Sequence, residues 1–338
     1  MTRDRQDADA TDAATPQIAL TGATGFLGSH IADRLLKAGY GVRASIRTTS
    51  SLRWITGKPI QPLRVDLAEV EDCRRLVAGC AGVIHCAGVT AAPTEEAYRR
   101  GNVDTTAALL TAAGEACGDG AFVLISSLAA HGPADREAPA VEGVPDRPIS
   151  AYGRSKLAAE RLVLDPGHGL RGVVLRPPSL YGPRDRDFLP LFRVARRGWT
   201  VRLGRQLAAL SLVDGRDAAA AAVALLAAPD ARGVYYVDDG RLGYALPELT
   251  AALAVAVQRP VRTLQVPLGL LQLASRLLGH SLAARSPVLN PDRLTDLAQT
   301  GWVCDGGRLA TETGFRPKYD AKRGLSETYA AYRREGWL

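Results

Sequence analysis

The segment YGRSK places a phenol, Tyr152, and an amine, Lys156, four residues apart. Side chains at positions i and i+4 of a helix leave the same face one turn apart, so the two groups are expected to be neighbours. A free tyrosine titrates near about pH 10, and a nearby ammonium stabilises its phenolate, which adapts Tyr152 to proton transfer near neutral pH. An amphipathic helix also produces this spacing by chance.

Lysine is rare in this chain, because arginine carries nearly all of its positive charge. A compact ammonium can hold a cofactor ribose hydroxyl in a small site that the planar fork of arginine would fit badly. We therefore interpret Lys156 as a lysine required for its size and point charge. The lysines of the chain are Lys37, Lys58, Lys156, Lys318 and Lys322.

A pair of serines, Ser126 and Ser127, ends the apolar run GAFVLISS, which we predict to be a strand. In a doubly wound sheet the carboxyl end of a strand faces the ligand crevice. A serine hydroxyl at that edge can donate to a substrate carbonyl or accept from an alcohol. We choose Ser127 because it lies five residues before Gly132 in SSLAAHG, and we predict that Ser127 and Tyr152 contact the substrate.

Three glycines, at positions 22, 25 and 28, lie between a predicted strand and a predicted helix that begins near Phe26. Glycines let the backbone turn tightly and approach a diphosphate, and the start of a helix directs N–H groups and a positive dipole end at that anion. The context indicates a dinucleotide site, with a purely structural turn as the alternative. The predicted cofactor contacts in this loop are Gly22, Thr24, Gly25, Phe26, Leu27 and Gly28.

The end of the second predicted strand bears on the choice of cofactor. An NAD enzyme places Asp or Glu about 20 residues beyond the glycines, to accept from the ribose 2′-OH, but no acidic residue occurs between Tyr40 and Val65. Arg47 stands there instead, followed by the hydroxyl-bearing run TTSS, and a guanidinium with hydroxyl donors suits a 2′-phosphate. We predict NADP(H), with NAD(H) as the alternative; a merely exposed Arg47 is the competing explanation.

Further cofactor contacts are predicted where the next strands end. Asp66 follows the third predicted strand, where its carboxylate could accept from the adenine amino group, and capping of the following helix is the alternative. In HCAG, small residues let the chain pass close to the ribose. The set is completed by Leu67, Ala87, Gly88, Tyr152, Lys156 and Pro178.

Strand and helix patterns alternate from residue 17 to 176, which predicts an α/β fold: a Rossmann doubly wound parallel sheet with helices on both faces. After Pro177 the alternation loosens. We predict three parts: a disordered leader at 1–16, an NADP-binding domain at 17–176 plus about 206–240, and a smaller, mostly helical C-terminal substrate domain at 177–205 plus about 241–338.

The composition is ordinary for a globular protein, with 338 residues, 46% of them hydrophobic and 23% charged. The net charge is +7, but the arginines are interleaved with acidic residues, so a solvated basic surface is favoured over nucleic-acid binding. No uncharged apolar run reaches about eighteen residues, so we expect neither an integral membrane segment nor a signal peptide. The cysteines show no CxxC pair and no metal-ligand spacing with histidine, which indicates reduced thiols, a cytoplasmic protein and no metal.

Two features of the second half leave alternatives open. The segment PLGLLQLASRLLGHSL repeats apolar residues at 270, 273, 274 and 277 with helical spacing. Core packing is favoured, and an apolar pocket or a membrane surface are the alternatives. A group of arginines is expected near the substrate entrance, either facing an acidic substrate group or on a solvated helix face: Arg184, Arg186, Arg193, Arg196, Arg197 and Arg202.

The motifs TGATGFLG, HCAG, LISS, YGRSK and LRPPSLYGPRD occur in an order and spacing that resemble the extended short-chain dehydrogenase/reductases, and more narrowly the NAD(P)-dependent epimerase/dehydratase family. The likeness covers about residues 17 to 338. It implies a Rossmann fold, a bound nicotinamide cofactor and a Ser–Tyr–Lys triad. By this resemblance Ser127 polarises the reacting oxygen, Tyr152 transfers the proton, and Lys156 lowers the pKa of the tyrosine and holds the ribose.

The resemblance implies two further features. Asn102 in GNVDTT matches the family's helix asparagine near the active site, and a capping or exposed asparagine is the alternative. Relatives often pair through the helices that correspond here to 95–116 and 150–165, which implies a homodimer.

Departures from the family pattern narrow the expected function. Leu128 and Ala129 follow Ser127 where dehydratases carry an acidic pair, and Ser179 stands where sugar-nucleotide epimerases carry an asparagine that contacts the substrate's phosphates. VRASIR with RPPSLYG looks more like the dihydroflavonol-reductase and hydroxysteroid-dehydrogenase side of the group. We therefore expect an NADP(H)-dependent enzyme that interconverts a ketone and a secondary alcohol on a mid-sized, largely apolar small molecule, with Ser179 as a further substrate contact. The alternatives are a sugar-nucleotide epimerase and a non-enzymatic NADP(H)-binding regulator.

Overall fold

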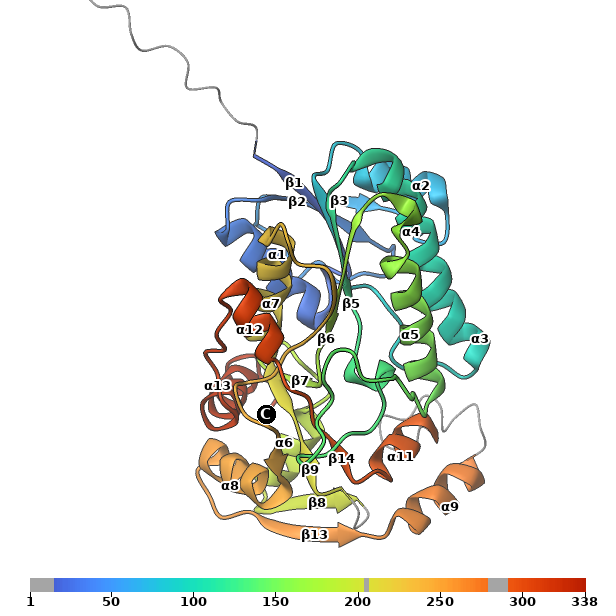
Figure 1. Ribbon diagram of the computed structural model, residues 1–338. Coiled ribbons are helices and arrows are strands. Elements are labelled where there is room, and N and C mark those ends of the chain that lie inside the picture. The colour runs from blue at the N-terminus through green and yellow to red at the C-terminus, as the bar shows by residue number, and fades with distance from the viewer. Residues whose placement is uncertain (1–14, 204–206, 279–290) are drawn as a thin grey trace, which may run out of the picture.

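A computed structural model describes residues 15–203, 207–278 and 291–338 of the chain. Residues 1–14 of the predicted leader lie outside the described residues. The larger, upper part of the molecule in Figure 1 is built around one sheet, and the C-terminal half of the chain adds helices and short strands below and beside it.

Seven parallel strands form this sheet, in the order β11-β6-β5-β4-β1-β2-β3. From β1 the chain adds strands outward through β2 to β3, and it then returns to place β4 on the other side of β1. Such a switch in strand order opens a ligand crevice outside the carboxyl ends of the strands. The predicted α/β Rossmann fold is confirmed. The strands are β1 (Gln17–Thr21), β2 (Gly41–Ile46), β3 (Ile60–Arg64), β4 (Gly82–His85), β5 (Ala121–Ile125), β6 (Arg171–Arg176) and β11 (Gly233–Tyr236).

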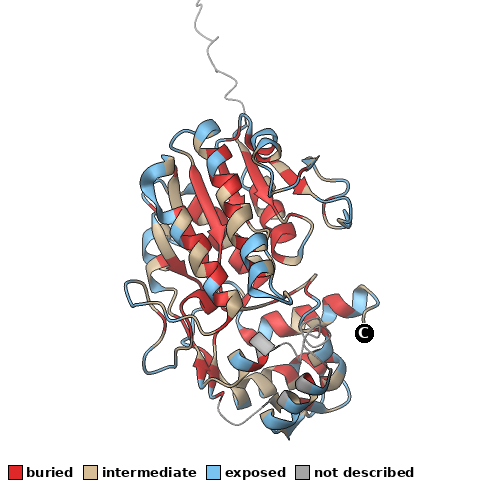
Figure 2. Ribbon diagram, turned by 90° about the vertical axis from the view of Figure 1, so that its right-hand side faces the viewer, coloured by how far each residue is buried: buried red, intermediate tan, exposed pale blue. Residues whose placement is uncertain are grey.

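Helices cover both faces of the sheet, so its strands are the most deeply buried layer, as Figure 2 shows. Successive residues of a strand point to opposite faces and therefore enter two different cores. This explains why these strands read as nearly continuous apolar runs. One face packs against α1 (Phe26–Lys37) and α7 (Gly215–Ala227), and the other against α2 (Val70–Val77), α4 (Thr105–Ala116) and α5 (Ala151–Leu164).

The long helix expected near 95–116 contains a widened turn. α3 (Glu95–Tyr98) continues through a π-helical segment, η1 (Arg99–Asp104), into α4. A π-helical turn adds a residue to the helix and often marks a functional site. Here it carries Asn102, which is buried and bonds to the turn that follows β4.

The remaining elements build a third core, which is rich in aromatic side chains, among them Tyr181, Phe192 and Tyr332. The strands of this part form only two- and three-stranded sheets, and the sequence did not predict them. The division into a cofactor domain and a substrate domain stays a prediction. The strands pair as β7 (Ser179–Tyr181) with β10 (Leu212–Asp214), β8 (Trp199–Leu203) with β13 (Arg262–Val266), and β9 (Ala209–Leu210) between β12 (Tyr244–Ala245) and β14 (Gly301–Trp302). The helices are α6 (Leu189–Ala195), α8 (Leu246–Val257), α9 (Leu268–Leu278), α11 (Pro291–Leu297), α12 (Gly307–Thr313) and α13 (Ala321–Arg334).

The expected core packing of the leucines at 270, 273 and 277 is wrong, because all three are exposed on α9. This helix lies at the lower edge of the molecule in Figure 1 and packs beside α11, with Ser275 rather than the leucine face turned inward. Among the described residues, no helix is both long enough and apolar enough to cross a bilayer.

Two helical glycines, one in α13 and one in α9, differ in how closely other residues pack against them. A Cβ at Gly324 would lie 2.1 Å from the hydroxyl oxygen of the buried Tyr181, whereas a Cβ at Gly269 in α9 meets nothing within 4 Å. We expect Gly324→Ala to lower the free energy of unfolding by about 1–3 kcal/mol through overpacking, and Gly269→Ala to raise it by roughly 0.5–1 kcal/mol. Urea unfolding of both variants measures these changes, and a similar small gain in both would contradict the described contact.

Candidate active site

The glycine loop after β1 requires its glycines for backbone packing. Gly22 has a φ of 73°, and a Cβ there would lie 2.8 Å from the nitrogen of Ala87. A Cβ at Gly28 would lie 2.0 Å from the carbonyl oxygen of Gly22. Any larger residue would push apart the strand, the turn and the helix that meet at this point.

The same loop leaves the start of α1 open toward the crevice. Gly25 is the N-cap residue, no side chain caps the helix, and no acidic residue occurs in the first turn. The N–H groups and dipole of α1 are therefore available to an anion. A dinucleotide diphosphate fits this cradle, in which Thr24 and Gly25 lie at the surface of the loop.

Two residues of the predicted loop set turn their side chains elsewhere. The ring of Phe26 packs against Gly215 at the start of α7, where a Cβ would approach it to 2.5 Å. Leu27 is buried in the core on that face of the sheet. Their backbone groups, and not their side chains, are the parts that can face a cofactor.

The turn after β4 lies beside the glycine loop and is fixed by Thr21. The Thr21 hydroxyl accepts from the nitrogens of Cys86 and Ala87, at 3.1 and 3.0 Å, and bonds to Nδ1 of the buried His85 at 2.7 Å. Burial, with a smaller effect of the Lys156 charge, lowers the pKa of His85 to about 3. His85 is thus a neutral structural residue of this turn.

Arg47 and Asp66 lie where β2 and β3 end, at the carboxyl edge of the sheet that also carries the glycine loop. Arg47 is exposed; its backbone nitrogen donates to the Ser50 hydroxyl at 2.9 Å, and its guanidinium makes no hydrogen bond or ion pair within the described residues. The Asp66 carboxylate accepts from the nitrogen of Ala68 at 3.0 Å. It therefore closes a local turn and does not cap α2, whose N-cap residue is Glu69; the neighbouring Leu67 is half-buried.

Ser127, Tyr152, Pro178 and Ser179 line one cavity of about 580 Å³ at the carboxyl edge of the sheet. Ser127 caps the short helix η2 (Leu128–Ala130), with its hydroxyl accepting from the nitrogen of Ala129 at 3.1 Å. The structure thus brings together the predicted substrate contacts from three separate segments. The cavity wall is mostly apolar, with Leu180, Phe188, Leu191, Leu207, Leu210 and Trp302 among its residues.

Lys156 lies behind this cavity and is almost completely buried. It follows Tyr152 by one turn of α5, and its ammonium donates to the carbonyl oxygen of Ile125 at 2.6 Å. Burial lowers the pKa of Lys156 to about 8, against the opposing charge of Glu160. A Cβ at Gly88 would lie 3.7 Å from the Lys156 nitrogen, so the turn after β4 passes directly over it.

Asn102 joins three elements around this lysine. Its side-chain oxygen accepts from the nitrogen of Val89 at 2.7 Å, and its side-chain nitrogen donates to the Val89 oxygen and to the Ser155 hydroxyl, at 3.0 and 2.9 Å. The Ser155 hydroxyl donates in turn to the carbonyl oxygen of Tyr152 at 2.7 Å. Asn102 therefore positions α5 against the turn after β4, and neither a capping nor an exposed position describes it.

A buried ion-pair network extends from the lysine away from the cavity. Glu160, one turn beyond Lys156, accepts from the hydroxyl of Ser126 and pairs with Arg176 at 2.5 Å. Arg176 also pairs with Asp146 at 2.6 Å and donates to the Tyr236 hydroxyl at 2.7 Å. Because a buried charge is costly unless it is paired, the guanidinium of Arg176 compensates the carboxylate behind the lysine.

Sequence reasoning missed Ser155, Glu160 and Arg176. The first two share the helix of the YGRSK motif, at spacings of three and eight residues from Tyr152, and this periodicity was the available signal. Arg176 could not be found that way, since its partners come from distant segments. The expected arginines do not line the cavity: Arg184 donates to Ser29 and pairs with Asp33 on α1, and none of the other five lines it within the described residues.

Known proteins resemble this chain in sequence and in fold. A family model described as the NAD dependent epimerase/dehydratase family matches residues 18–237. A ceramide reductase of Caulobacter vibrioides is 30% identical, over 95% of this chain and 96% of its own length. A UDP-glucose 4-epimerase of Vibrio cholerae is 27% identical, over 93% of this chain and 95% of its own. The structure of a UDP-glucose 4-epimerase of Thermus thermophilus with NAD superimposes with a TM-score of 0.75 at 24% identity, over 94% of this chain and 99% of the other.

The environment of Lys156 predicts a pH dependence. We expect turnover to fall as the pH rises through about 8, the pKa of Lys156, because a neutral amine no longer stabilises a phenolate. Glu160→Gln removes a negative charge that raises this pKa, so the inflection should move to lower pH. The pH profile of kcat/KM measures the shift, with Glu115→Gln, at an exposed carboxylate, as the control. An unchanged inflection in Glu160→Gln would contradict the coupling.

Proposed function

The chain belongs to the NAD-dependent epimerase/dehydratase family of extended short-chain dehydrogenase/reductases, and from this premise we propose that it interconverts a ketone and a secondary alcohol on a mid-sized, largely apolar molecule, with NADP(H) as the preferred cofactor. Because the members of this family are NAD(P)-dependent enzymes, the alternative of a non-enzymatic NADP(H)-binding regulator is set aside. The observation that carries the proposal is the cavity in which Ser127 and Tyr152 meet a mostly apolar wall. The similarity to a ceramide reductase supports an apolar substrate.

The roles of the chain's own residues follow from their places around the cavity. When bound, the nicotinamide cofactor supplies the hydride in reduction and accepts it in oxidation. In reduction the Ser127 hydroxyl donates to the substrate carbonyl and Tyr152 gives its proton to the same oxygen, so that C=O becomes CH–OH. General acid–base assistance of this kind contributes roughly 10²–10⁴-fold, and the rest must come from holding the reacting carbons together.

Lys156 serves Tyr152 through charge and position. With a pKa of about 8, its buried amine carries a proton at neutral pH. The positive charge one turn from Tyr152 favours the phenolate that remains after proton transfer. Its place beside Gly88, under the turn that approaches the ribose, supports a second role in holding a ribose hydroxyl.

Charge in the cavity favours the ketone–alcohol reaction over the sugar-nucleotide alternative. A nucleotide diphosphate needs cationic partners, but no lysine or arginine lines the cavity within the described residues, and its charged wall residues are Asp187 and Asp296. The similarity to a UDP-glucose 4-epimerase keeps epimerisation as the second candidate.

Replacing the phenol tests the proton donor. We expect Tyr152→Phe to reduce ketone reduction by about 10²–10⁴-fold or more while the dissociation constant for NADPH stays nearly unchanged, because the ring remains and only the hydroxyl is lost. Tyr40→Phe, remote from the cavity, is the matched control. Steady-state rates and fluorescence titration measure the two quantities, and turnover that survives in Tyr152→Phe would show that another group donates the proton.

The wild-type stoichiometry separates the two candidate reactions within the same assay. A panel of a keto-ceramide, a steroid ketone, a flavanonol and UDP-glucose offers each chemistry in turn. The ketone reductase oxidises one NADPH for each alcohol formed. Interconversion of UDP-glucose and its epimer without net cofactor oxidation would establish the epimerase instead.

The exposed guanidinium at the end of β2 tests the cofactor preference. We expect wild-type protein to bind NADPH more tightly than NADH, and Arg47→Glu to weaken NADPH binding by at least about tenfold with little effect on NADH, because a charge-assisted contact to the 2′-phosphate becomes a repulsion. Arg161→Glu, an exposed arginine on α5, is the control for net charge. Dissociation constants by titration decide, and tighter NADH binding by the wild type would overturn the preference.

A further inference from the structure

The lower edge of the molecule carries an apolar surface that the substrate cavity does not use. β8 and β13 form a two-stranded parallel ribbon in which Trp199 lies beside Arg262 and Val201 beside Leu264. Residues paired in a parallel ladder point to the same face. Trp199, Val201 and Leu264 are all exposed, and Leu264 is 53% exposed, whereas Thr200, which points the opposite way along β8, is buried.

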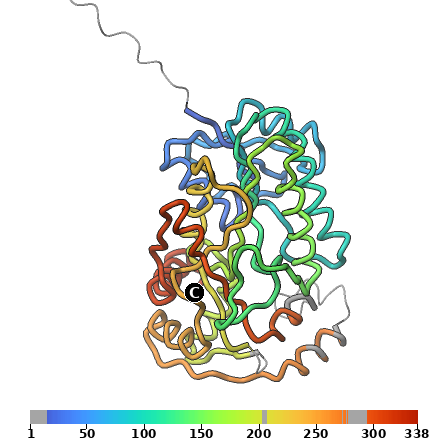
Figure 3. The backbone as a smooth tube through the Cα atoms, in the orientation of Figure 1, coloured from blue at the N-terminus to red at the C-terminus, as the bar shows by residue number. Residues whose placement is uncertain are grey.

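The helix that follows the ribbon extends this surface. The chain runs from β13 directly into α9 along the lower edge, as the tube in Figure 3 shows. Leu270, Leu273 and Leu277 recur at the spacing of one helix face, and they are 59%, 54% and 79% exposed. Monomeric proteins rarely expose several large apolar side chains along one edge without a use for them. We call these six residues of the ribbon and helix the apolar stripe.

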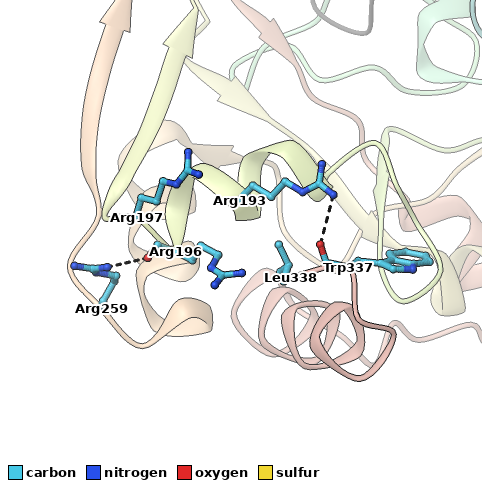
Figure 4. A pocket seen from close by; sticks show the side chains of 6 residues that line it. All are labelled: Arg193, Arg196, Arg197, Arg259, Trp337 and Leu338. Atoms are coloured by element: carbon cyan, nitrogen blue, oxygen red, sulfur yellow. Dashed lines mark hydrogen bonds between the residues drawn. The ribbon is translucent and has the colours of Figure 1, made fainter.

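A group of arginines lies at the ribbon end of the apolar stripe. Arg193, Arg196, Arg197 and Arg259 surround a pocket of about 680 Å³, which Figure 4 shows together with the C-terminal residue Leu338. Arg259 donates to the carbonyl oxygen of Arg196 at 2.8 Å, and the nitrogen of Arg262 donates to the oxygen of Gly198 at 2.9 Å, so this arginine cluster is continuous with the strands. None of the four forms an ion pair with an acidic side chain of the described residues, whereas arginines elsewhere, such as Arg74 and Arg99, do.

We infer that the apolar stripe and the arginine cluster form a docking surface for a bilayer that contains anionic lipids. Leucines on one helix face, with a tryptophan beside them, suit the boundary between head groups and acyl chains. Unpaired arginines next to that boundary attract anionic head groups, and each positive charge near such a surface adds to binding. The complementarity of charge selects this occupant over an uncharged protein surface.

A second copy of the chain is the competing occupant. A two-fold contact with the two stripes parallel would bring the arginine clusters of both copies together, in a protein that already carries a net charge of +7. The anionic membrane avoids this repulsion. It also accounts for the presence of unpaired arginines beside the leucines, which a purely apolar interface does not require.

Docking in this way would also orient the substrate cavity. α9 packs against α11, and Asp296 and Leu297 of α11 lie in the cavity wall. An apolar substrate dissolved in the bilayer would then have a short path to Tyr152. This last step rests on the proposed function, but membrane docking itself does not, so vesicle binding can be measured without any turnover.

Vesicle co-sedimentation of the full chain tests the inference. We expect binding to vesicles of equal parts phosphatidylcholine and phosphatidylglycerol, much weaker binding to phosphatidylcholine alone, and loss of binding at high salt. Leu273→Asp with Leu277→Asp should abolish binding, since two exposed leucines become charged. Arg197→Glu with Arg259→Glu should weaken it by at least about tenfold, because attraction becomes repulsion.

Matched controls lie on α5, far from the lower edge: Leu164→Asp for the leucines and Arg161→Glu for the arginines. Both should bind as the wild type does, and circular dichroism checks that every variant is folded. Absence of vesicle binding by the wild type, or equal loss in the control variants, would overturn the inference. So would light scattering that shows a dimer which Leu277→Asp dissociates, since the stripe would then be an interface between copies.

Discussion

The proposed mechanism depends on keeping one buried ammonium charged. Burial lowers the pKa of Lys156, and the carboxylate of Glu160 one turn away opposes that effect. Glu160 is itself buried, so it needs the paired guanidinium of Arg176, which in turn needs Asp146 and the Tyr236 hydroxyl. A single requirement of the chemistry, a positive charge beside a phenol, thus fixes contacts among α5, β6, β11 and the segment before α5.

Sequence motifs predicted what is local and missed what depends on distant partners. The glycine loop, the serine after β5 and the Tyr152–Lys156 pair each carry their signal within a few residues, and the alternation of strands and helices gave the sheet. The widened turn at Asn102 could not be predicted, because a π-helical turn shows only in backbone geometry. The Arg176 network joins residues far apart in the chain, and the leucines of α9 have helical spacing whether their face is buried or exposed.

Charges are distributed unevenly over the molecule in a way that bears on its substrate. Many arginines outside the cavity pair with acidic side chains, as Arg74 does, and four gather at the lower edge beside exposed apolar residues. The cavity has acidic and apolar walls, with Asp187, Phe188 and Leu191 on one segment. A neutral, apolar molecule fits that wall better than an anionic nucleotide does. The same molecule would partition into the bilayer to which we propose that the lower edge binds.

The most direct test of this account is the pKa of the Lys156 ammonium itself. With lysine at only five positions, selective isotope labelling of lysine gives a short set of nitrogen signals, and a Lys156→Met variant assigns the buried one. The account predicts that this signal titrates near pH 8, well below the ordinary value of 10.5 for a lysine. A value near the ordinary 10.5 would contradict the burial of this amine, and a value well below about 7 would show that the network behind it does not keep it charged.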